Sequence, residues 1–284
     1  MNPALLFDLD ETLMVEEAAA SASFAAVAEF AATTRDIDAR RLAVAARDHA
    51  RQLWYESPTI EYCLRIGISS WEGLWCRYEG DGPEVRSLRD WAPAYRQETW
   101  RLALSDQGTD DPRLAAELGD RFGAERRARH ELFEDAAESL ANLRRGHSMA
   151  LVTNGATCLQ REKLAASGLG GYFDAVVVSE DLGMAKPEAA VFEHALSMIG
   201  ADREQAVMIG DSLSKDVDGA LAAGLQAIWL NREPGRTSGG RQDLIEIATL
   251  RELPEAVSLL TGWTPRDRDQ SSAAPSRRPG PGVV

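Results

Sequence analysis

Short apolar runs alternate with helical stretches from about residue 148 to residue 230, and this alternation constrains the fold more than any other feature of the sequence. The runs are SMALVT, DAVVVS, AVMIGD and QAIWL, and helices are expected between them at about 158–167, 188–199 and 214–223. Strands that alternate with helices form parallel sheets with helices on both faces. The run that opens the chain, LLFDLD, has a similar composition and should join them. We therefore expect the α/β class, with a Rossmann-like parallel sheet core.

A long block of predicted helix separates this first run from the others. Six helices are expected in it, and Ser69 with Glu72 has the spacing of a capping box at the start of the fourth. A helical block that interrupts a sheet protein is most simply an inserted domain. We expect an all-helical cap domain at 15–132 between two parts of the core, 1–14 and 133–262. The six helices are expected at 16–33, 38–55, 59–66, 70–78, 84–104 and 111–128.

The last part of the chain, 263–284, differs in composition from the rest. It holds four of the twelve prolines and almost no large apolar side chains. A segment of this kind buries too little apolar surface to offset the entropy lost on ordering. We predict a disordered tail there, with no function implied.

The charge balance and the cysteines restrict the partners and the compartment. The net charge is −14, with 45 acidic against 31 basic residues, which argues against nucleic acid or an anionic membrane surface as the main partner. No apolar run approaches the ~20 residues of a membrane span, and the N-terminus does not resemble a secretory signal. Cys63, Cys76 and Cys158 are too few and too scattered for a disulfide framework or a zinc cluster. A cytoplasmic location fits best, and the oligomeric state stays open.

Polar side chains follow four of the predicted strands at the point where each strand ends. Asp8 and Asp10 end the first run, and because alternate strand residues point the same way, both can face one side. Two such charges repel each other unless a cation or a proton intervenes, so this stretch predicts a metal ion. In open parallel sheets, ligands bind at the carboxyl ends of the strands, so the groups should meet in one site. The others are Thr153, Asn154 and Gly155; Lys186 and Pro187; and Asp211, Ser212 and Asp216.

Each of these short patterns is common by itself, but their order and their place at strand ends are not. Together they resemble the four motifs of the haloacid dehalogenase superfamily of aspartate-nucleophile phosphohydrolases. FDLDETL is similar to the first motif, TNG to the second, the loop lysine of SEDLGMAKPEAAVF to the third and IGDSLSKDVDGA to the fourth. The stretch 153–187 is similar to the branch that contains N-acylneuraminate phosphatases and pyrimidine nucleotidases. The resemblance covers about 1–15 and 130–262, and the helical block stands where such enzymes carry a helical cap, although it is longer.

The resemblance implies a magnesium-dependent phosphatase that acts on a small phosphorylated metabolite. Asp8 would attack phosphorus and form an aspartyl-phosphate, which water then hydrolyses. Asp10 would protonate the leaving oxygen and afterwards deprotonate the attacking water. Asp8, the backbone carbonyl of Asp10 and Asp211 would bind Mg²⁺, a hard cation that prefers oxygen ligands.

Further residues would support this chemistry. Thr153, Asn154 and Lys186 would hold the phosphoryl oxygens, where charge compensation matters most. Asp216 would orient a water on the metal or pair with Lys186. Ser212 would cap the following helix close to the metal.

Three functions other than that of a phosphatase are considered for the same set of residues. A dehalogenase of the same superfamily would displace halide from carbon and would need neither Asp10 nor Asp211 with magnesium, so these residues argue against it. A sugar phosphomutase would keep every group and differ in the cap, which would present a phosphorylated intermediate instead of admitting water. A non-catalytic binding protein on a phosphatase scaffold is disfavoured by the intact set of acidic and phosphate-binding residues.

Aromatic residues are concentrated in the helical block, which holds five of the seven tryptophans and four of the five tyrosines. Packing between helices explains most of them. A cap that closes over the sheet must also contact the part of the substrate that is not phosphate, and aromatic side chains suit a ring or an apolar group. Trp71 and Trp75 are four residues apart on one predicted helix face and flank Gly73, so they are our candidate walls of the substrate site.

Overall fold

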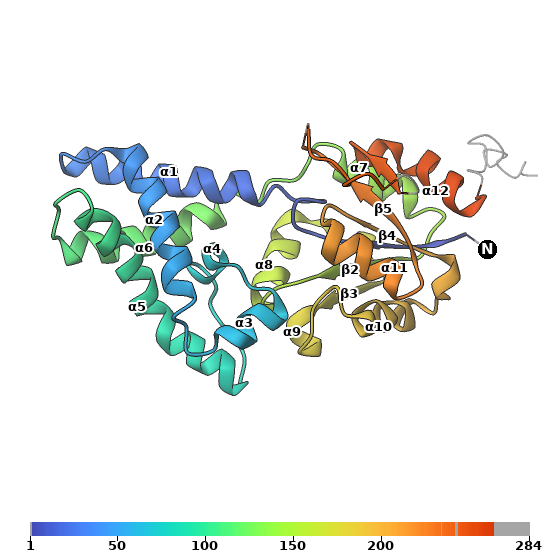
Figure 1. Ribbon diagram of the computed structural model, residues 1–284, viewed down its shortest axis with the longest axis horizontal. Coiled ribbons are helices and arrows are strands. Elements are labelled where there is room, and N and C mark those ends of the chain that lie inside the picture. The colour runs from blue at the N-terminus through green and yellow to red at the C-terminus, as the bar shows by residue number, and fades with distance from the viewer. Residues whose placement is uncertain (1, 234, 242–243, 264–284) are drawn as a thin grey trace, which may run out of the picture.

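The protein has two lobes that are joined side by side (Figure 1). The computed structural model describes residues 2–233, 235–241 and 244–263, so of the predicted tail only Trp263 is included. One lobe contains the parallel sheet and its helices, and the other contains only helices. We call the helical lobe, residues 17–127, the cap.

Six strands form one parallel sheet in the order β3-β2-β1-β4-β5-β6. The first strand lies in the middle, with Leu6 beside Ala150 of the second strand and Met208 of the fourth. This order places β2, β1 and β4 side by side, so the polar residues at their carboxyl ends lie close together, where a ligand site is expected. The predicted α/β class is confirmed, and one short strand, β6, was not expected. The strands are β1 Ala4–Phe7, β2 Met149–Thr153, β3 Ala175–Val178, β4 Ala206–Gly210, β5 Gln226–Leu230 and β6 Ile245–Ile247.

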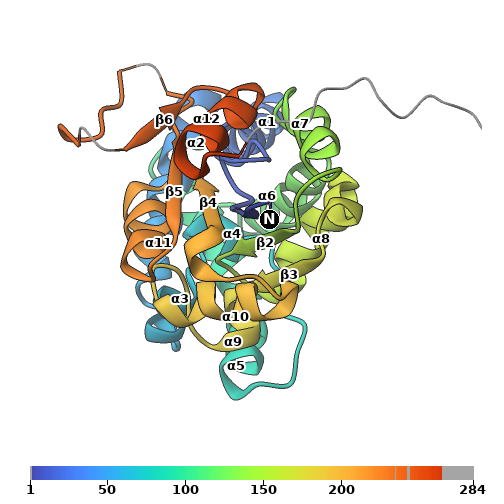
Figure 2. The ribbon, with the colours of Figure 1, turned by 90° about the vertical axis from the view of Figure 1, so that its right-hand side faces the viewer.

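Helices cover both faces of the sheet (Figure 2). Alternate residues of β1 point to opposite faces, so Leu5 and Phe7 belong to one apolar cluster and Leu6 to another. All three side chains are fully buried, as in other parallel sheets that are covered on both faces. The first cluster is completed by α7 (Ala136–Leu143) and α12 (Leu253–Thr261), and the second by α10 (Ala189–Ile199) and α11 (Asp218–Ala222).

The connections at the carboxyl ends of the strands differ in detail from the prediction. The helix expected at 214–223 is divided into a π-helical turn, Leu213–Val217, and α11. A π-helical turn is uncommon and often marks a functional site, and this one follows the fourth motif. After β2, α8 (Thr157–Ser167) matches the helix expected at about 158–167, whereas the short α9 (Ser179–Leu182) after β3 was not expected.

The cap has an apolar core of its own. Phe24, Trp100 and Phe122 meet in it, with the rings of Phe24 and Phe122 4.5 Å apart. The start of α8 from the sheet lobe packs against the same cluster through Leu159, so the two lobes share an apolar contact. The helices of the cap are α1 Glu17–Thr34, α2 Ala39–Trp54, α3 Ile60–Ile66, α4 Ser70–Gly73, α5 Pro83–Ser105 and α6 Pro112–Arg127.

The fourth cap helix starts as predicted but ends early. Ser69 and Glu72 form the expected capping box, with each side chain bonded to the other residue's backbone amide. The helix stops at Gly73, however, instead of continuing to residue 78. A Cβ at Gly73 would lie 2.3 Å from the ring of Trp54, so this glycine lets α2 approach closely. Because the helix is so short, Trp71 and Trp75 do not share a helical face, which corrects that expectation.

The chain passes between the lobes twice, and the two passages are hydrogen-bonded to each other. The Val15 amide donates to the Glu131 carbonyl at 3.0 Å, and the Phe133 amide donates to the Leu13 carbonyl at 3.1 Å. Met14 and Leu132 form the antiparallel bridge between them. Among the described residues, no helix combines the length and the apolar character needed to cross a bilayer.

Candidate active site

The carboxyl ends of β1, β2 and β4 open into a cavity of about 520 Å³ between the sheet lobe and the cap. The core residues proposed for catalysis, phosphate binding and metal binding, together with Ser212 and Asp216, all border this cavity. The sheet lobe contributes Asp8, Asp10, Thr153, Asn154, Lys186, Asp211, Ser212 and Asp216, and the cap contributes Glu17, Gly67, Ser69, Trp71 and Glu72.

Lys186 is a buried ammonium held between two carboxylates. Its Nζ lies 2.6 Å from Asp8 Oδ1 and 2.7 Å from Asp216 Oδ1. Burial opposes the charge of Lys186, but the carboxylates of Asp216 and Asp8 outweigh burial and raise the pKa of the ammonium. Lys186 is therefore a fixed positive charge beside Asp8, and its pairing with Asp216 matches one of the two roles expected for Asp216.

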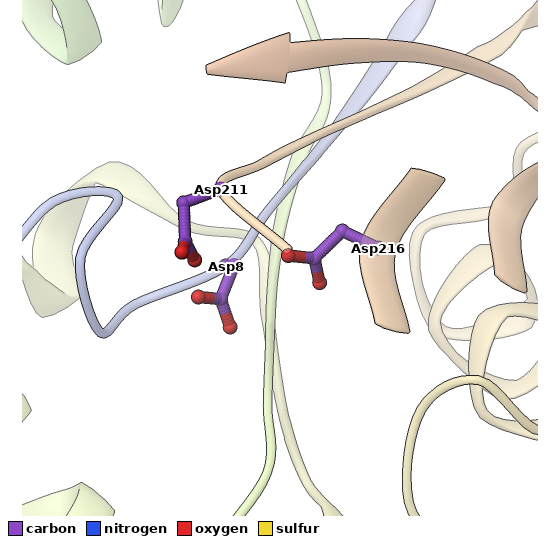
Figure 3. A group of neighbouring side chains, drawn as sticks. All are labelled: Asp8, Asp211 and Asp216. Atoms are coloured by element: carbon purple, nitrogen blue, oxygen red, sulfur yellow. The ribbon is translucent and has the colours of Figure 1, made fainter. Parts of the chain in front are cut away.

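Three carboxylates converge at the ends of β1 and β4 (Figure 3). Asp8, Asp211 and Asp216 each offer an oxygen, and these oxygens lie within 4.8 Å of one another. Gly210 makes this approach feasible, because a Cβ there would lie 2.3 Å from Asp216 Oδ2. Burial, with the charges of Asp8 and Asp216, raises the pKa of Asp211 to about 7. Mutually repelling carboxylate oxygens of this kind fit a hard cation such as Mg²⁺, with Asp216 as a third carboxylate that the predicted ligand set lacked.

Ser212 fixes the turn that carries Asp216. Its backbone amide donates to Asp216 Oδ2 at 2.9 Å, and its hydroxyl accepts a hydrogen bond from the Lys215 amide at 3.3 Å. Ser212 is thus the cap of the π-helical turn, as the sequence predicts, and it holds the Asp216 carboxylate toward the cluster.

Asp10 lies in a different environment from Asp8, although only one residue separates them. Its two oxygens both lie 3.1 Å from Lys163 Nζ, and Gln160 donates to Oδ2 at 3.2 Å. Burial raises the pKa of Asp10 to about 7 against the opposing charge of Lys163, and nearby Glu16 and Glu72 add to the rise. A carboxyl group with a pKa near neutrality can both give and take a proton.

The second motif supplies one free hydroxyl and one structural amide. Thr153 is 1% exposed, and its Oγ1 has no hydrogen-bond partner among the described residues although it borders the cavity. A buried unpartnered hydroxyl is costly and suits a ligand oxygen. The Asn154 side chain instead donates to the Lys186 carbonyl at 3.0 Å and accepts from the Lys186 amide at 2.9 Å. Asn154 therefore holds the Lys186 loop in place.

The two tryptophans proposed as walls of the site have different surroundings. Trp71 is half-buried, borders the cavity and lies under the Arg47 guanidinium, 5.3 Å from the ring centre. Trp75 is 1% exposed and packs in the cap core, with Arg126 and Arg127 at 5.0 and 5.3 Å from its ring. Its burial makes it a core residue, which corrects its nomination as a wall.

Several residues that sequence reasoning missed contribute charge or hydrogen bonds at the site. Lys163 and Gln160 on α8 contact Asp10, Glu72 of the cap contacts both of them, and Arg236 Nη1 lies 3.7 Å from Asp211 Oδ2. The signal for the α8 pair was a glutamine and a lysine three residues apart on the side of the helix that also carries the buried Leu159 and Leu164. Arg236 follows β5 in a loop and carries no comparable pattern.

Comparisons with known proteins agree with this geometry. A family model described as haloacid dehalogenase-like hydrolase matches residues 3–224. Phosphoserine phosphatase of Thermus thermophilus is 39% identical over 256 residues, which are 90% of this chain and 99% of that protein. N-acylneuraminate-9-phosphatase of Rattus norvegicus is 35% identical over 143 residues, which are 49% of this chain and 58% of that protein. The structure of the HAD-hydrolase YfnB of Bacillus subtilis, described as bound to magnesium, shares the fold, with 23% identity and a TM-score of 0.61 over 90% of this chain and 98% of that one.

Proposed function

The chain belongs to the haloacid dehalogenase-like hydrolases and is a phosphatase of that family, and we propose that it hydrolyses a small phosphate monoester with magnesium through an aspartyl-phosphate on Asp8. The observation that carries the proposal is the contrast between the two aspartates after β1. Asp8 lies 2.6 Å from the Lys186 ammonium, whereas Asp10 contacts Lys163 and has a pKa raised to about 7. One carboxylate suits attack, and the other suits proton transfer.

In the first half-reaction, an Asp8 carboxylate oxygen attacks phosphorus and the bond from phosphorus to the leaving oxygen breaks. Asp10 gives its proton to that oxygen, so the product leaves as an alcohol. In the second half-reaction, Asp10 takes a proton from water as the water attacks phosphorus. The bond between Asp8 and phosphorus then breaks, which releases inorganic phosphate and restores both aspartates.

In the proposed reaction, the phosphoryl oxygens bind next to one positive charge and one free hydroxyl. Lys186 provides the charge, and the unpartnered Thr153 hydroxyl provides a donor from the end of β2. Asn154 acts on the same group by fixing the Lys186 backbone. Donors held in advance of the reaction stabilise the transition state without reorganisation.

The carboxylates of Asp8 and Asp211 and the backbone carbonyl of Asp10 would hold the magnesium ion, with Asp216 as a further carboxylate of the cluster. When bound, Mg²⁺ supplies charge compensation for the phosphoryl oxygens. The ion would also offset the repulsion from Asp8 and Asp216, which adds to burial in raising the pKa of Asp211.

The cap favours hydrolysis over phosphomutase chemistry. A mutase must hold a second phosphate on the cap side of its site, and the side chains that usually bind phosphate are lysine and arginine. Among the described residues, the part of the cavity lining that comes from the cap includes no lysine or arginine, and it includes the carboxylates of Glu17 and Glu72. This wall would repel a second phosphate. The cations that line the cavity all come from the sheet lobe.

The relatives indicate where the search for the substrate should begin. The Thermus protein named phosphoserine phosphatase matches almost the whole of both chains, so phosphoserine is the first substrate to test. We further propose a cytoplasmic location, supported by three cysteines that form no disulfide in the structure.

A phosphate-release assay tests the proposal directly. The purified protein is incubated with phosphoserine, sugar phosphates and nucleoside monophosphates, in Mg²⁺ or in excess chelator. We expect release from at least one compound in Mg²⁺ and its loss in chelator. Full activity in chelator would contradict the metal assignment, and interconversion of sugar phosphate isomers without phosphate release would favour the mutase.

A further inference from the structure

A buried cluster of charges joins the cap to Asp10. Lys163 on α8 is fully buried, and its ammonium contacts carboxylates from three parts of the chain. Its Nζ lies 3.1 Å from Asp10, 3.2 Å from Glu16 at the start of the cap, and 2.8 Å from Glu72 on α4. Gln160, one turn earlier on α8, likewise donates to both Asp10 and Glu72 at 3.2 Å.

Glu72 belongs to the cap, but its carboxylate is hydrogen-bonded to residues of both lobes. One of its oxygens accepts from the Ser69 amide and hydroxyl at 2.9 and 2.8 Å, which fixes the carboxylate on the cap. The other oxygen accepts from Lys163 and Gln160 in the sheet lobe. Loss of a carboxylate partner from a buried ammonium costs free energy. Movement of α4 away from α8 must therefore change how Lys163 and Gln160 hold Asp10.

We propose that Glu72 is a positioning residue, which holds Lys163 and Gln160 where they orient Asp10 for proton transfer to the leaving oxygen. This inference rests on the proposed function, because it concerns the acid step of that reaction. Docking of the cap then completes the acid, and a substrate bound under an undocked cap meets a poorly placed Asp10. Glu72 acts through its two contacts on α8 and takes no proton itself.

The choice of leaving group separates this role from a structural one. The leaving group of an alkyl phosphate is a strongly basic alkoxide, which needs the proton from Asp10. The leaving group of p-nitrophenyl phosphate is a stabilised phenolate, which needs that proton much less. The value of kcat/KM reports the steps up to transfer of the phosphoryl group to Asp8. The test therefore compares kcat/KM for phosphoserine, glycerol phosphate and p-nitrophenyl phosphate.

Four variants make the comparison decisive. Asp10→Asn shows the full selective loss on alkyl phosphates. We expect Glu72→Ala to lower kcat/KM for both alkyl phosphates on the order of tenfold more than for the aryl phosphate, part of the 10² to 10⁴ that an acid contributes. Glu72→Gln, which keeps an oxygen toward Lys163 and the capping spacing, should restore most of the loss. Glu162→Ala is the matched control, because it breaks another contact between α8 and the cap, Arg127 Nε to Glu162 Oε1 at 2.7 Å, without touching Asp10.

Each outcome has a distinct meaning. Equal losses on all three substrates in Glu72→Ala, or the same selectivity in Glu162→Ala, would overturn the positioning role. A loss confined to one alkyl phosphate would mean that Glu72 contacts the leaving group itself, which also overturns it. If Asp10→Asn shows no selectivity, the acid assigned in the proposed function is wrong, and wild-type inactivity on every phosphate would contradict that function as a whole.

A second observation, independent of the charge cluster, concerns two cysteines. Cys76 lies in the cap segment after α4, Cys158 is the second residue of α8, and their Sγ atoms are 3.6 Å apart. Cys76 is fully buried, whereas Cys158 is partly exposed. Sulfur atoms at this distance need to close by about 1.5 Å to reach the ~2.05 Å of a disulfide.

Cys158 is the reactive member of the pair. The hydrogen bond from the Cys76 thiol, supported by backbone amides of Glu79 and Tyr78, lowers the pKa of Cys158 to about 7. Burial raises the pKa of Cys76 well above its usual value, and it raises the pKa of the third cysteine, Cys63, to about 11. The thiolate is the nucleophile in thiol oxidation, so Cys158 should react first.

We infer that Cys76 and Cys158 form a disulfide that ties the cap to the sheet lobe when the protein meets a peroxide. The Cys158 thiolate attacks one peroxide oxygen, the O–O bond breaks, and Cys158 becomes a sulfenic acid as the peroxide is reduced to water. The sulfur of Cys76 then attacks the sulfenic sulfur, the S–O bond breaks, and the oxygen leaves with the Cys76 proton as a second water. A dithiol reverses the reaction.

Peptide mapping by mass spectrometry tests this inference. The protein is treated with dilute hydrogen peroxide, blocked with an alkylating reagent and digested without reductant. We expect a linked pair of peptides containing Cys76 and Cys158 that disappears with dithiothreitol and in Cys158→Ser. Cys63→Ser is the matched control and should leave the linked pair unchanged. Overoxidised Cys158 without linkage, or linkage to Cys63, would overturn the inference.

Discussion

The sheet lobe buries charged side chains at its strand ends, whereas the core of the cap consists largely of apolar and aromatic side chains. At the strand ends, Lys186 is buried between Asp8 and Asp216, an arrangement that burial of charge makes costly. In the cap, Trp91 stacks on Tyr95 with ring centres 4.6 Å apart, and such packing is favourable by itself. The strand ends of the sheet lobe are therefore arranged for reaction, and the cap core mainly for stability. Substitutions at the strand ends should therefore lower turnover, whereas substitutions in the cap core should lower stability.

The largest effect is expected from Asp8→Asn. Asp8 is the proposed nucleophile and an amide cannot replace its carboxylate in that role, so turnover should fall by about 10⁴ or more, as when other enzymes lose a nucleophile. The substitution is nearly isosteric, so the melting temperature should change little. Phosphate release and thermal unfolding measure the two quantities. Activity near that of the wild type would contradict the covalent mechanism.

Asp10→Asn should cost less, on the order of 10² to 10⁴ in turnover, the usual contribution of a general acid or base. Its fold should also persist, because Asn can keep a hydrogen bond from Gln160 or Lys163. Steady-state kinetics on an alkyl phosphate measures the loss. An unchanged rate on the alkyl phosphate would contradict the role of Asp10 as general acid and base.

Trp75→Ala tests the cap, and its effect should be on stability. Removing a fully buried tryptophan should cost about 3 to 5 kcal/mol of unfolding free energy. Activity per folded molecule should fall alike on every substrate, because Trp75 does not border the cavity. Urea unfolding and kinetics on two substrates provide the measurements. A substrate-selective loss with unchanged stability would place Trp75 at the site after all.

Trp71→Ala should give the smallest effect and the most selective one. Trp71 borders the cavity, and a ring stacked on substrate is worth roughly 0.5 to 1.5 kcal/mol beyond its buried area. We expect a several-fold to about tenfold lower kcat/KM for a ring-bearing phosphate, and little change for acetyl phosphate. Uniform loss on both, with a large fall in melting temperature, would make Trp71 a packing residue like Trp75.

The fold was largely predictable because its signals are local. Apolar runs and helical stretches identified β1 to β5 and the six cap helices within a few residues. The exceptions have tertiary causes. The helix of Trp71 ends at Gly73, where Trp54 packs against the backbone, and β6 is a three-residue edge strand, Ile245–Ile247, that carries little pattern of its own.

Part of the candidate site was also predictable from local signals, namely the residues at the strand ends. Residues that directly follow a strand are placed by the sheet, so Asp8, Thr153 and Asp211 could be expected to meet. Glu72 and Lys163 could not, because they lie 91 residues apart and neither follows a strand. Their contact exists only because α4 of the cap docks on α8.

The groups proposed to carry the chemistry could all be named from the sequence: two aspartates after the first strand, and then a threonine, a lysine and a further aspartate in a fixed order at strand ends. Periodicity and motif order are properties of neighbouring residues, so they can be read without coordinates. The way in which the two lobes meet could be seen only in the folded protein. Tertiary packing buried Trp75 but left Trp71 at the cavity, brought Cys76 to Cys158, and set Glu72 against Lys163. Contacts between distant segments depend on packing and burial, which no local pattern encodes.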